Sequence, residues 1–193
     1  MRTPTTILAA LVLALTCAAA NAAPKDELHE AFSKFLKAQS FRATVTDVKK
    51  GKEMTSMEFV APDRYRMKAS TGQTNLIIGD DMFMEINGKL TKLPVPGVGQ
   101  MTTQFRSERF LHDVEGDIVV KALPDDSVDG EPAKVYAYSV TKPVKSDSKA
   151  WVSKKSGLVI QIESTGSFMG RASTTRVHYS DFDDAAIKIA APN

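Results

Sequence analysis

Apolar and polar residues alternate with a period of two along most of this chain, and this pattern limits the folds that it can adopt. Phe41, Ala43 and Val45 alternate with polar neighbours, and similar alternation recurs as far as Tyr179. Because successive side chains of a strand point to opposite faces, each such segment predicts a strand with one apolar side. Asn87-Gly88 favours a tight hairpin turn. We therefore expect a long antiparallel meander of roughly ten strands.

Two segments show helical spacing instead. In residues 25–39, Leu28, Ala31 and Phe35 fall on one face, and residues 100–112 show a second apolar side after a Pro/Gly loop at 94–99. A sheet of this length curls, and its apolar face must be covered by other elements. The two helices are the available cover. We therefore predict an α+β fold in which a curved antiparallel sheet forms an incomplete β-barrel closed by helices.

Turn residues set the expected ends of the later strands. Residues 118–123 and 133–141 are predicted strands, with a turn at Asp129-Gly130 between them. Residues 142–149 are polar and predict a hairpin loop. No repeat or linker divides the chain, so we expect one domain.

The first residues have the pattern of a cleavable secretory signal peptide. Arg2 supplies the positive end, and residues 7–15 are apolar but only about half the length that a membrane-spanning helix needs. Ala20-Asn21-Ala22 matches the small-residue site that signal peptidase cuts. We therefore predict a signal peptide at residues 1–22, a mature domain at 23–193 and a periplasmic location.

Cys17, the only cysteine, lies just after the apolar stretch, where a bacterial lipoprotein carries its acylated cysteine. Lipoprotein processing prefers a small residue directly before that cysteine and a Leu three positions before it. Those positions hold Thr16 and Ala14. We therefore expect Cys17 to be removed with the signal peptide, which leaves a mature chain without a disulfide or a thiolate nucleophile.

Residues that support catalysis or metal binding are sparse. The three histidines, His29, His112 and His178, lie far apart without metal-ligand spacing. Three aspartate pairs are interpreted as turn residues, since neighbouring strand residues point to opposite faces: Asp80-Asp81, Asp125-Asp126 and Asp183-Asp184. The 25 basic and 23 acidic residues are interspersed, unlike a nucleic-acid-binding surface. We expect no enzyme activity, no metal, no cofactor and no nucleic-acid partner.

Four short segments resemble motifs of the LolA/LolB-like family of periplasmic lipoprotein carriers. They are residues 39–43 (QSFRA), 59–66 (FVAPDRYR), 77–84 (IIGDDMFM) and 151–162 (WVSKKSGLVIQI). Their order and spacing carry the resemblance, which extends over nearly the whole mature chain. It implies a half-barrel that is closed by helices around an apolar cavity for acyl chains of lipoproteins or other lipids.

The resemblance turns the apolar strand face into a candidate cavity lining. Methionine is unbranched and polarizable, so a methionine-rich face suits a pocket for flexible chains. The alternative is a filled, packed core. The expected lining residues are Phe41, Val45, Met57, Phe59, Tyr65, Met67, Leu76, Ile78, Met82, Met84 and Ile86, and the expected lid residues are Met101, Phe105 and Phe110.

One departure from the family bears on mechanism. Dedicated LolA carriers have an arginine directly before the strand-three proline, which latches the lid, whereas this chain has Ala61. Arg64 and Arg66 are nearby, but alternation places them on the outer face. Two hypotheses remain: a monomeric periplasmic carrier of lipid or lipoprotein acyl chains, and a module on the same scaffold, with a filled core, that binds an envelope protein or senses envelope stress.

Overall fold

The computed structural model describes residues 23–115, 118–141, 145–168 and 171–192; the predicted signal peptide and Cys17 lie outside these ranges. Within them the chain forms one antiparallel sheet of 11 strands and the helices α1 (Pro24–Lys37), α2 (Val98–Phe105) and α3 (Glu108–Glu115). The strands are β1 (Ser40–Asp47), β2 (Lys52–Val60), β3 (Arg64–Ala69), β4 (Thr74–Ile78), β5 (Asp81–Ile86), β6 (Lys89–Leu93), β7 (Val120–Val128), β8 (Glu131–Val140), β9 (Ser146–Ser153), β10 (Val159–Phe168) and β11 (Arg171–Ser180).

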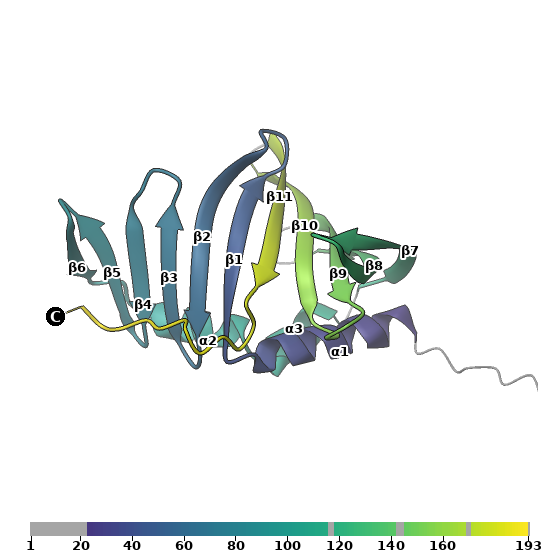
Figure 1. Cartoon of the computed structure of the whole chain (residues 1–193), viewed down its shortest axis with the longest axis horizontal. Coiled ribbons are helices and arrows are strands. Elements are labelled where there is room, and N and C mark those ends of the chain that lie inside the picture. The colour runs from purple at the N-terminus through teal and green to yellow at the C-terminus, as the bar shows by residue number, and fades with distance from the viewer. Residues whose placement is uncertain (1–22, 116–117, 142–144, 169–170, 193) are drawn as a thin grey trace, which may run out of the picture.

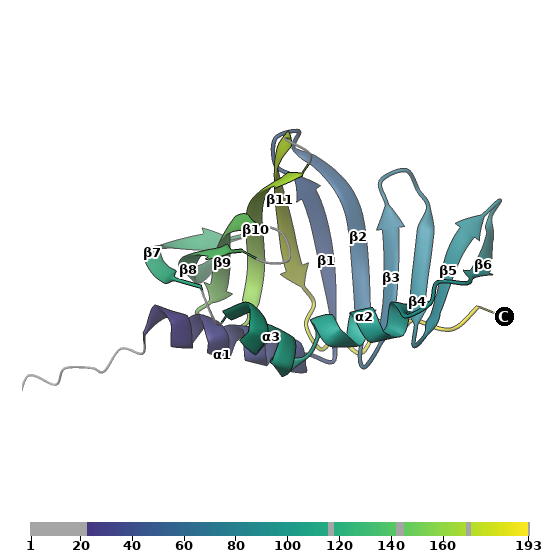
Figure 2. The same ribbon diagram turned by 180° about the vertical axis from the view of Figure 1, so that it is seen from behind.

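The sheet is curved and open, and the helices lie along the lower ends of its strands (Figures 1 and 2). Its strand order is β6-β5-β4-β3-β2-β1-β11-β10-β9-β8-β7, so two meanders join where β1 pairs with β11. The predicted α+β class and incomplete barrel are confirmed. Only the β1–β11 pairing joins strands distant in sequence, and local alternation cannot specify it.

Strand register defines two faces. Phe41 pairs with Phe59, and Phe59 pairs with Tyr65. We call the face that carries these three residues the inner face. The other, outer face carries Arg42 and Glu58, which pair with each other in the same register.

The prediction that Leu76 and Ile78 share the face of Phe41 is wrong. Leu76 pairs with Arg66 and Ile78 with Arg64, so both lie on the outer face, while Ile77 lies on the inner face. Residues 76–78 are all apolar, so they contain no alternation from which a phase could be derived. Apolar residues are tolerated on both faces of β4, where Leu76 and Ile77 are both buried.

The single helix predicted at residues 100–112 is two helices. α2 ends at Phe105, Arg106 has non-helical torsions (φ −105°, ψ 24°), and α3 begins at Glu108. Ser107 lies between them, and its hydroxyl donates to the carbonyl oxygen of Gln104. Serine competes for backbone hydrogen bonds and favours helix ends.

Two later boundaries also differ from expectation. β7 continues past Leu123 through Asp125-Asp126, so that aspartate pair is not a turn; a register shift between Leu123 and Asp126 marks a bulge. β9 begins at Ser146 inside the predicted loop, while residues 142–144 lie outside the described ranges. The bulge lets Asp126 accept a hydrogen bond from the indole nitrogen of Trp151 at 3.0 Å.

α1 covers the inner face at the β7–β10 end of the sheet. Leu28 and Ala31 of α1 pack with buried residues of three strands, namely Tyr136, Ala150, Val152 and Val159. These are among the most buried side chains in the described chain, and Leu28 is only 1% exposed. The amphipathic pattern of α1 therefore finds its apolar partner here, which leaves the β3–β6 end of the sheet to α2.

Candidate functional site

An aromatic cluster fills the centre of the inner face. Phe41 and Phe59 stack with ring centroids 5.0 Å apart, and Tyr65 of β3 lies at the same distance from Phe59. Phe35 of α1 approaches Phe41 and Tyr179 from above, with centroids at 5.1 and 4.8 Å. Phe59 is fully buried. Phe41 and Phe59 therefore pack as core residues in this structure.

The inner face becomes less covered toward β5 and β6. Met57, Met67 and Met84 lie in one cross-sheet row, and Met82 lies in the neighbouring row, in register with Ile77. All four methionines are partly buried, and Ile86 at the end of β5 is 44% exposed. We call these five inner-face residues, Met57, Met67, Met82, Met84 and Ile86, the methionine face. Val45 lies farther along β1, also partly buried.

Asn75 interrupts the methionine row. It pairs in register with Met67 on one side and Met84 on the other, so it lies on the inner face. Its Oδ1 is buried and has no hydrogen-bond partner among the described residues. A buried acceptor without a donor is costly, so Asn75 is a polar defect in an otherwise apolar row.

α2, which carries the first of the expected lid residues, lies along the lower ends of the strands and contacts β4 and β5 (Figure 2). Gly97 starts it in a left-handed conformation (φ 78°), and Gly99 lies so close to the β4–β5 turn that an added Cβ would be 2.2 Å from Asp80 Oδ1. Met101 is 50% exposed. The side chains of Phe105 and Phe110, the other expected lid residues, lie outside the described part.

Sequence reasoning missed Arg106, at the junction of α2 and α3. Its guanidinium carbon lies 4.0 Å from the centre of the Phe59 ring and 5.6 Å from that of Phe41. Its Nη2 donates to the carbonyl oxygen of Leu36 at 2.7 Å, and at longer range to those of Phe35 and Ala38. A cation is favoured at a helix C-terminus and over an aromatic ring. No local sequence motif marks such a residue.

Burial and two nearby tyrosines shift the pKa of Arg106 in opposite directions. Burial lowers the pKa of the Arg106 guanidinium, and the neighbouring Tyr65 and Tyr179 hydroxyls oppose that shift. Burial raises the pKa of Tyr179 and of Tyr65, while the Arg106 charge acts to lower both. Arginine stays protonated at physiological pH, so this region of the inner face carries one fixed positive charge.

Comparison with solved structures shows where this architecture recurs. LprF from Mycobacterium bovis superposes with a TM-score of 0.63 at 12% sequence identity, over 88% of this chain and 96% of LprF. The fold is LolA/LolB-like. The complex of Pseudomonas aeruginosa MucA/MucB gives a lower TM-score of 0.42 at 14% identity, over 86% of this chain and 58% of that one. No family model matches the sequence, and no curated protein matches it.

This chain has an alanine at the position where the resemblance implies a lid-latching arginine. Ala61 stands before Pro62, and its backbone N–H donates to the carbonyl oxygen of Gln39. Arg64 and Arg66 lie on the outer face, as alternation predicted. The cation at the C-terminal end of α1 comes instead from Arg106, between α2 and α3.

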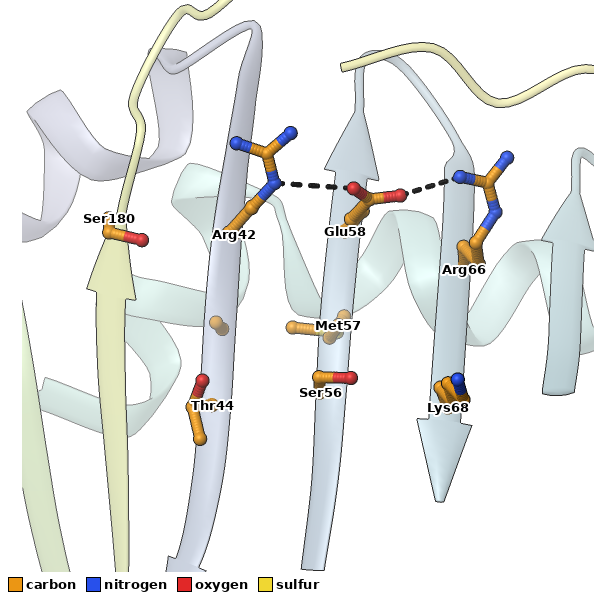
Figure 3. Close-up of a pocket in the computed structure, with 9 residues that line it drawn as sticks. Arg42, Thr44, Ser56, Met57, Glu58, Arg66, Lys68 and Ser180 are labelled. Atoms are coloured by element: carbon orange, nitrogen blue, oxygen red, sulfur yellow. Dashed lines mark hydrogen bonds and ion pairs between the residues drawn. The ribbon is translucent and has the colours of Figure 1, made fainter. Parts of the chain in front are cut away.

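The outer face is polar across β1, β2 and β3. A groove of about 340 Å³ crosses β1, β2 and β3, with Arg42, Glu58 and Arg66 in a line (Figure 3). Glu58 accepts from Arg42 at 3.3 Å and from Arg66 at 2.7 Å.

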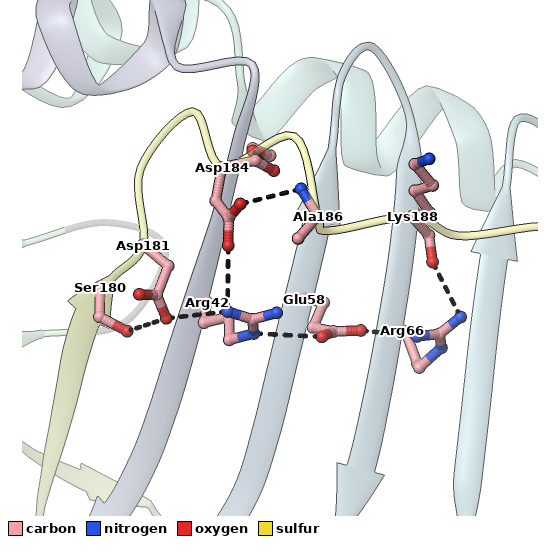
Figure 4. A network of polar contacts seen from close by, with 9 residues as sticks. Arg42, Glu58, Arg66, Ser180, Asp181, Asp184, Ala186 and Lys188 are labelled. Atoms are coloured by element: carbon pink, nitrogen blue, oxygen red, sulfur yellow. Dashed lines mark hydrogen bonds and ion pairs between the residues drawn. The ribbon is translucent and has the colours of Figure 1, made fainter.

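The C-terminal segment joins this network (Figure 4). Arg42 also pairs with Asp181 and Asp184, and Arg66 donates to the carbonyl oxygen of Lys188. Arg42, Glu58 and Arg66 of this groove therefore all have partners, and the segment is tied to the sheet.

Within the described ranges, no group of three or more His, Cys, Asp or Glu side chains could hold a metal ion. None of the described helices combines the length and apolar character needed to cross a bilayer.

Proposed function

We propose that this chain is a periplasmic carrier that binds acyl chains of lipids or lipoproteins on its inner face, without catalysis. The observation that carries the proposal is the methionine face, a set of partly exposed, flexible apolar side chains on the inner face. Folded cores bury such residues, and apolar surface left open in a concave fold is a common feature of binding sites. The overlap with LprF supports the architecture that this function needs.

The driving force would be apolar burial. Each methylene group moved from water to an apolar surface contributes about 0.8 kcal/mol, so one long acyl chain supplies several kcal/mol after the cost of ordering. Methionine side chains adapt their shape at low cost, which suits chains of different length. The expected lining residues that remain on the inner face of β5 are Met82, Met84 and Ile86.

Mass spectrometry of lipids that co-purify with the protein tests this function directly, together with uptake of a fluorescent fatty acid. Met84→Glu should abolish both, because it places a charge on the methionine face. Ser56→Glu is the matched control, since Ser56 lies on the outer face. Circular dichroism should show both variants folded. Unchanged lipid retention in Met84→Glu would contradict the carrier function.

A second function has one observation in its favour. Phe41 and Phe59 are filled core, so the inner face is not a continuous cavity. A scaffold with a filled centre suits a module that binds an envelope protein partner or senses envelope stress. Absence of co-purified lipid and of fatty-acid uptake in the wild-type protein would favour this alternative.

The periplasmic location rests on the predicted signal peptide. α1 begins at Pro24 with Ala23 as its N-cap residue, so cleavage before Ala23 would leave the whole helix in the mature protein. N-terminal sequencing of protein from a periplasmic extract should start at Ala23. A mature chain that retains an acylated Cys17 would instead indicate a membrane-anchored receptor.

A further inference from the structure

Arg106 differs from the arginines of the outer face in its partners. Arg42 and Arg66 each pair with Glu58, whereas no carboxylate of the described chain pairs with Arg106. A guanidinium has five N–H donors. The protein contacts of Arg106 all use Nη2, and the donors on Nε and Nη1 have no acceptor among the described residues. Arg106 therefore has N–H donors that the described residues leave unused, and its charge is opposed by aromatic rings and backbone carbonyls rather than by a carboxylate.

The position of Arg106 relates this charge to the methionine face. Its guanidinium stacks on Phe59 of β2. From Phe59 the same cross-sheet row continues through Tyr65 and Ile77 to Met82 of β5. Neighbouring strands lie about 4.8 Å apart, so Phe59 and Met82 are separated by about 14 Å. A long acyl chain, when extended, is long enough to reach from the Arg106 cation to the methionine face.

We propose that the ligand of this face is an anionic amphiphile whose carboxylate or phosphate head binds Arg106 and whose acyl chain lies along the methionine face. This inference rests on the proposed carrier function and names its ligand class. A guanidinium donates two parallel N–H bonds to a carboxylate or phosphate, and charge-assisted bonds of this kind are strong. A partly buried cation without a counter-ion is unfavourable, and an anionic head removes that cost.

Competition against an uncharged probe tests the headgroup. Laurate, dodecyl phosphate and dodecanol share one chain length, and each is titrated at neutral pH against protein loaded with N-phenylnaphthylamine. Laurate or dodecyl phosphate should displace the probe at a concentration roughly 10- to 100-fold lower than dodecanol. The two anions also distinguish a carboxylate head from a phosphate head.

Substitution then tests the residue. Arg106→Gln should lose the preference for the anions over dodecanol. Arg109→Gln is the matched control, because Arg109 is an exposed arginine of the next helix. Should Arg106→Gln fail to fold, the Nε–H NMR signal of Arg106 in the wild-type protein decides instead, since laurate should shift it and dodecanol should not.

Each contrary result has a separate meaning. Equal displacement by laurate, dodecyl phosphate and dodecanol would overturn the headgroup inference and leave the carrier function standing. A preference for anions that survives in Arg106→Gln, or an Arg106 signal that laurate does not shift, would overturn the assignment to this residue. Failure of the probe and of all three amphiphiles to bind would overturn the carrier function, and this inference with it.

Discussion

The inner face has a covered end at β7–β10 and an open end at β3–β6, although one continuous sheet forms both. At the β7–β10 end, α1 inserts Leu28 and Ala31 among residues that are almost entirely buried. At the β3–β6 end, α2 approaches β4 and β5 but leaves Met82, Met84 and Ile86 partly exposed. This difference underlies our proposal that the first end stabilises the fold and the second binds a ligand. Four sets of substitutions test this contrast.

The largest expected effect is at the covered end. Leu28→Ala should lower the free energy of unfolding by about 2–5 kcal/mol, because it leaves a cavity between α1 and the sheet. Met84→Ala, the comparison at the open end, should cost about 1 kcal/mol, since that side chain already contacts solvent. Urea unfolding measures both. Equal losses would show that the two ends are equally packed.

Gly99→Ala should displace α2, the helix that contacts the open end. An added Cβ would lie 2.8 Å from the carbonyl oxygen of Gly79 as well as against Asp80, so α2 must shift. We expect a loss of about 1–3 kcal/mol and faster hydrogen exchange in α2. Gly166→Ala is the control, because its Cβ would approach no atom closer than 3.5 Å. Unchanged exchange in α2 would show that α2 is not held by this contact.

Asn75→Leu should stabilise the open end. The substitution removes a buried acceptor without a partner and adds an apolar side chain between Met67 and Met84. The gain in the free energy of unfolding should be about 1 kcal/mol, and Asn75→Asp should be destabilising. Calorimetry of the three proteins checks the order. A loss in Asn75→Leu would mean that Asn75 has a polar role at this site.

The smallest effect concerns the edge of the covered end. Hydrogen bonds from Lys134 and Tyr136 lower the pKa of Glu27 below its ordinary value of 4.5. A lowered pKa in the folded state means that ionised Glu27 contributes stability near neutral pH, which is lost as the pH falls through that pKa. Glu27→Gln should therefore cost about 1 kcal/mol or less near neutral pH, and the difference from wild type should shrink in acid.

Glu30→Gln is the control for that pH series. Glu30 is exposed and, among the described residues, forms an ion pair only with Lys34 of the same helix, at 3.0 Å. Urea unfolding across the acid range should show a smaller pH-dependent difference for Glu30→Gln than for Glu27→Gln. A constant difference between Glu27→Gln and wild type at every pH would show that the hydrogen bonds to Glu27 do not depend on its charge.

The sequence by itself determined most of the strands, the first helix and the face of most strand residues. These properties are local, because alternation and helical spacing depend on neighbours in the chain. The tertiary structure decided the phase of β4, where Leu76, Ile77 and Ile78 contain no alternation. It also decided that Phe41 and Phe59 are core while Met84 and Ile86 stay open, because burial depends on where α1 and α2 come to lie. Arg106 meets Phe59 only through that packing, which no local pattern encodes.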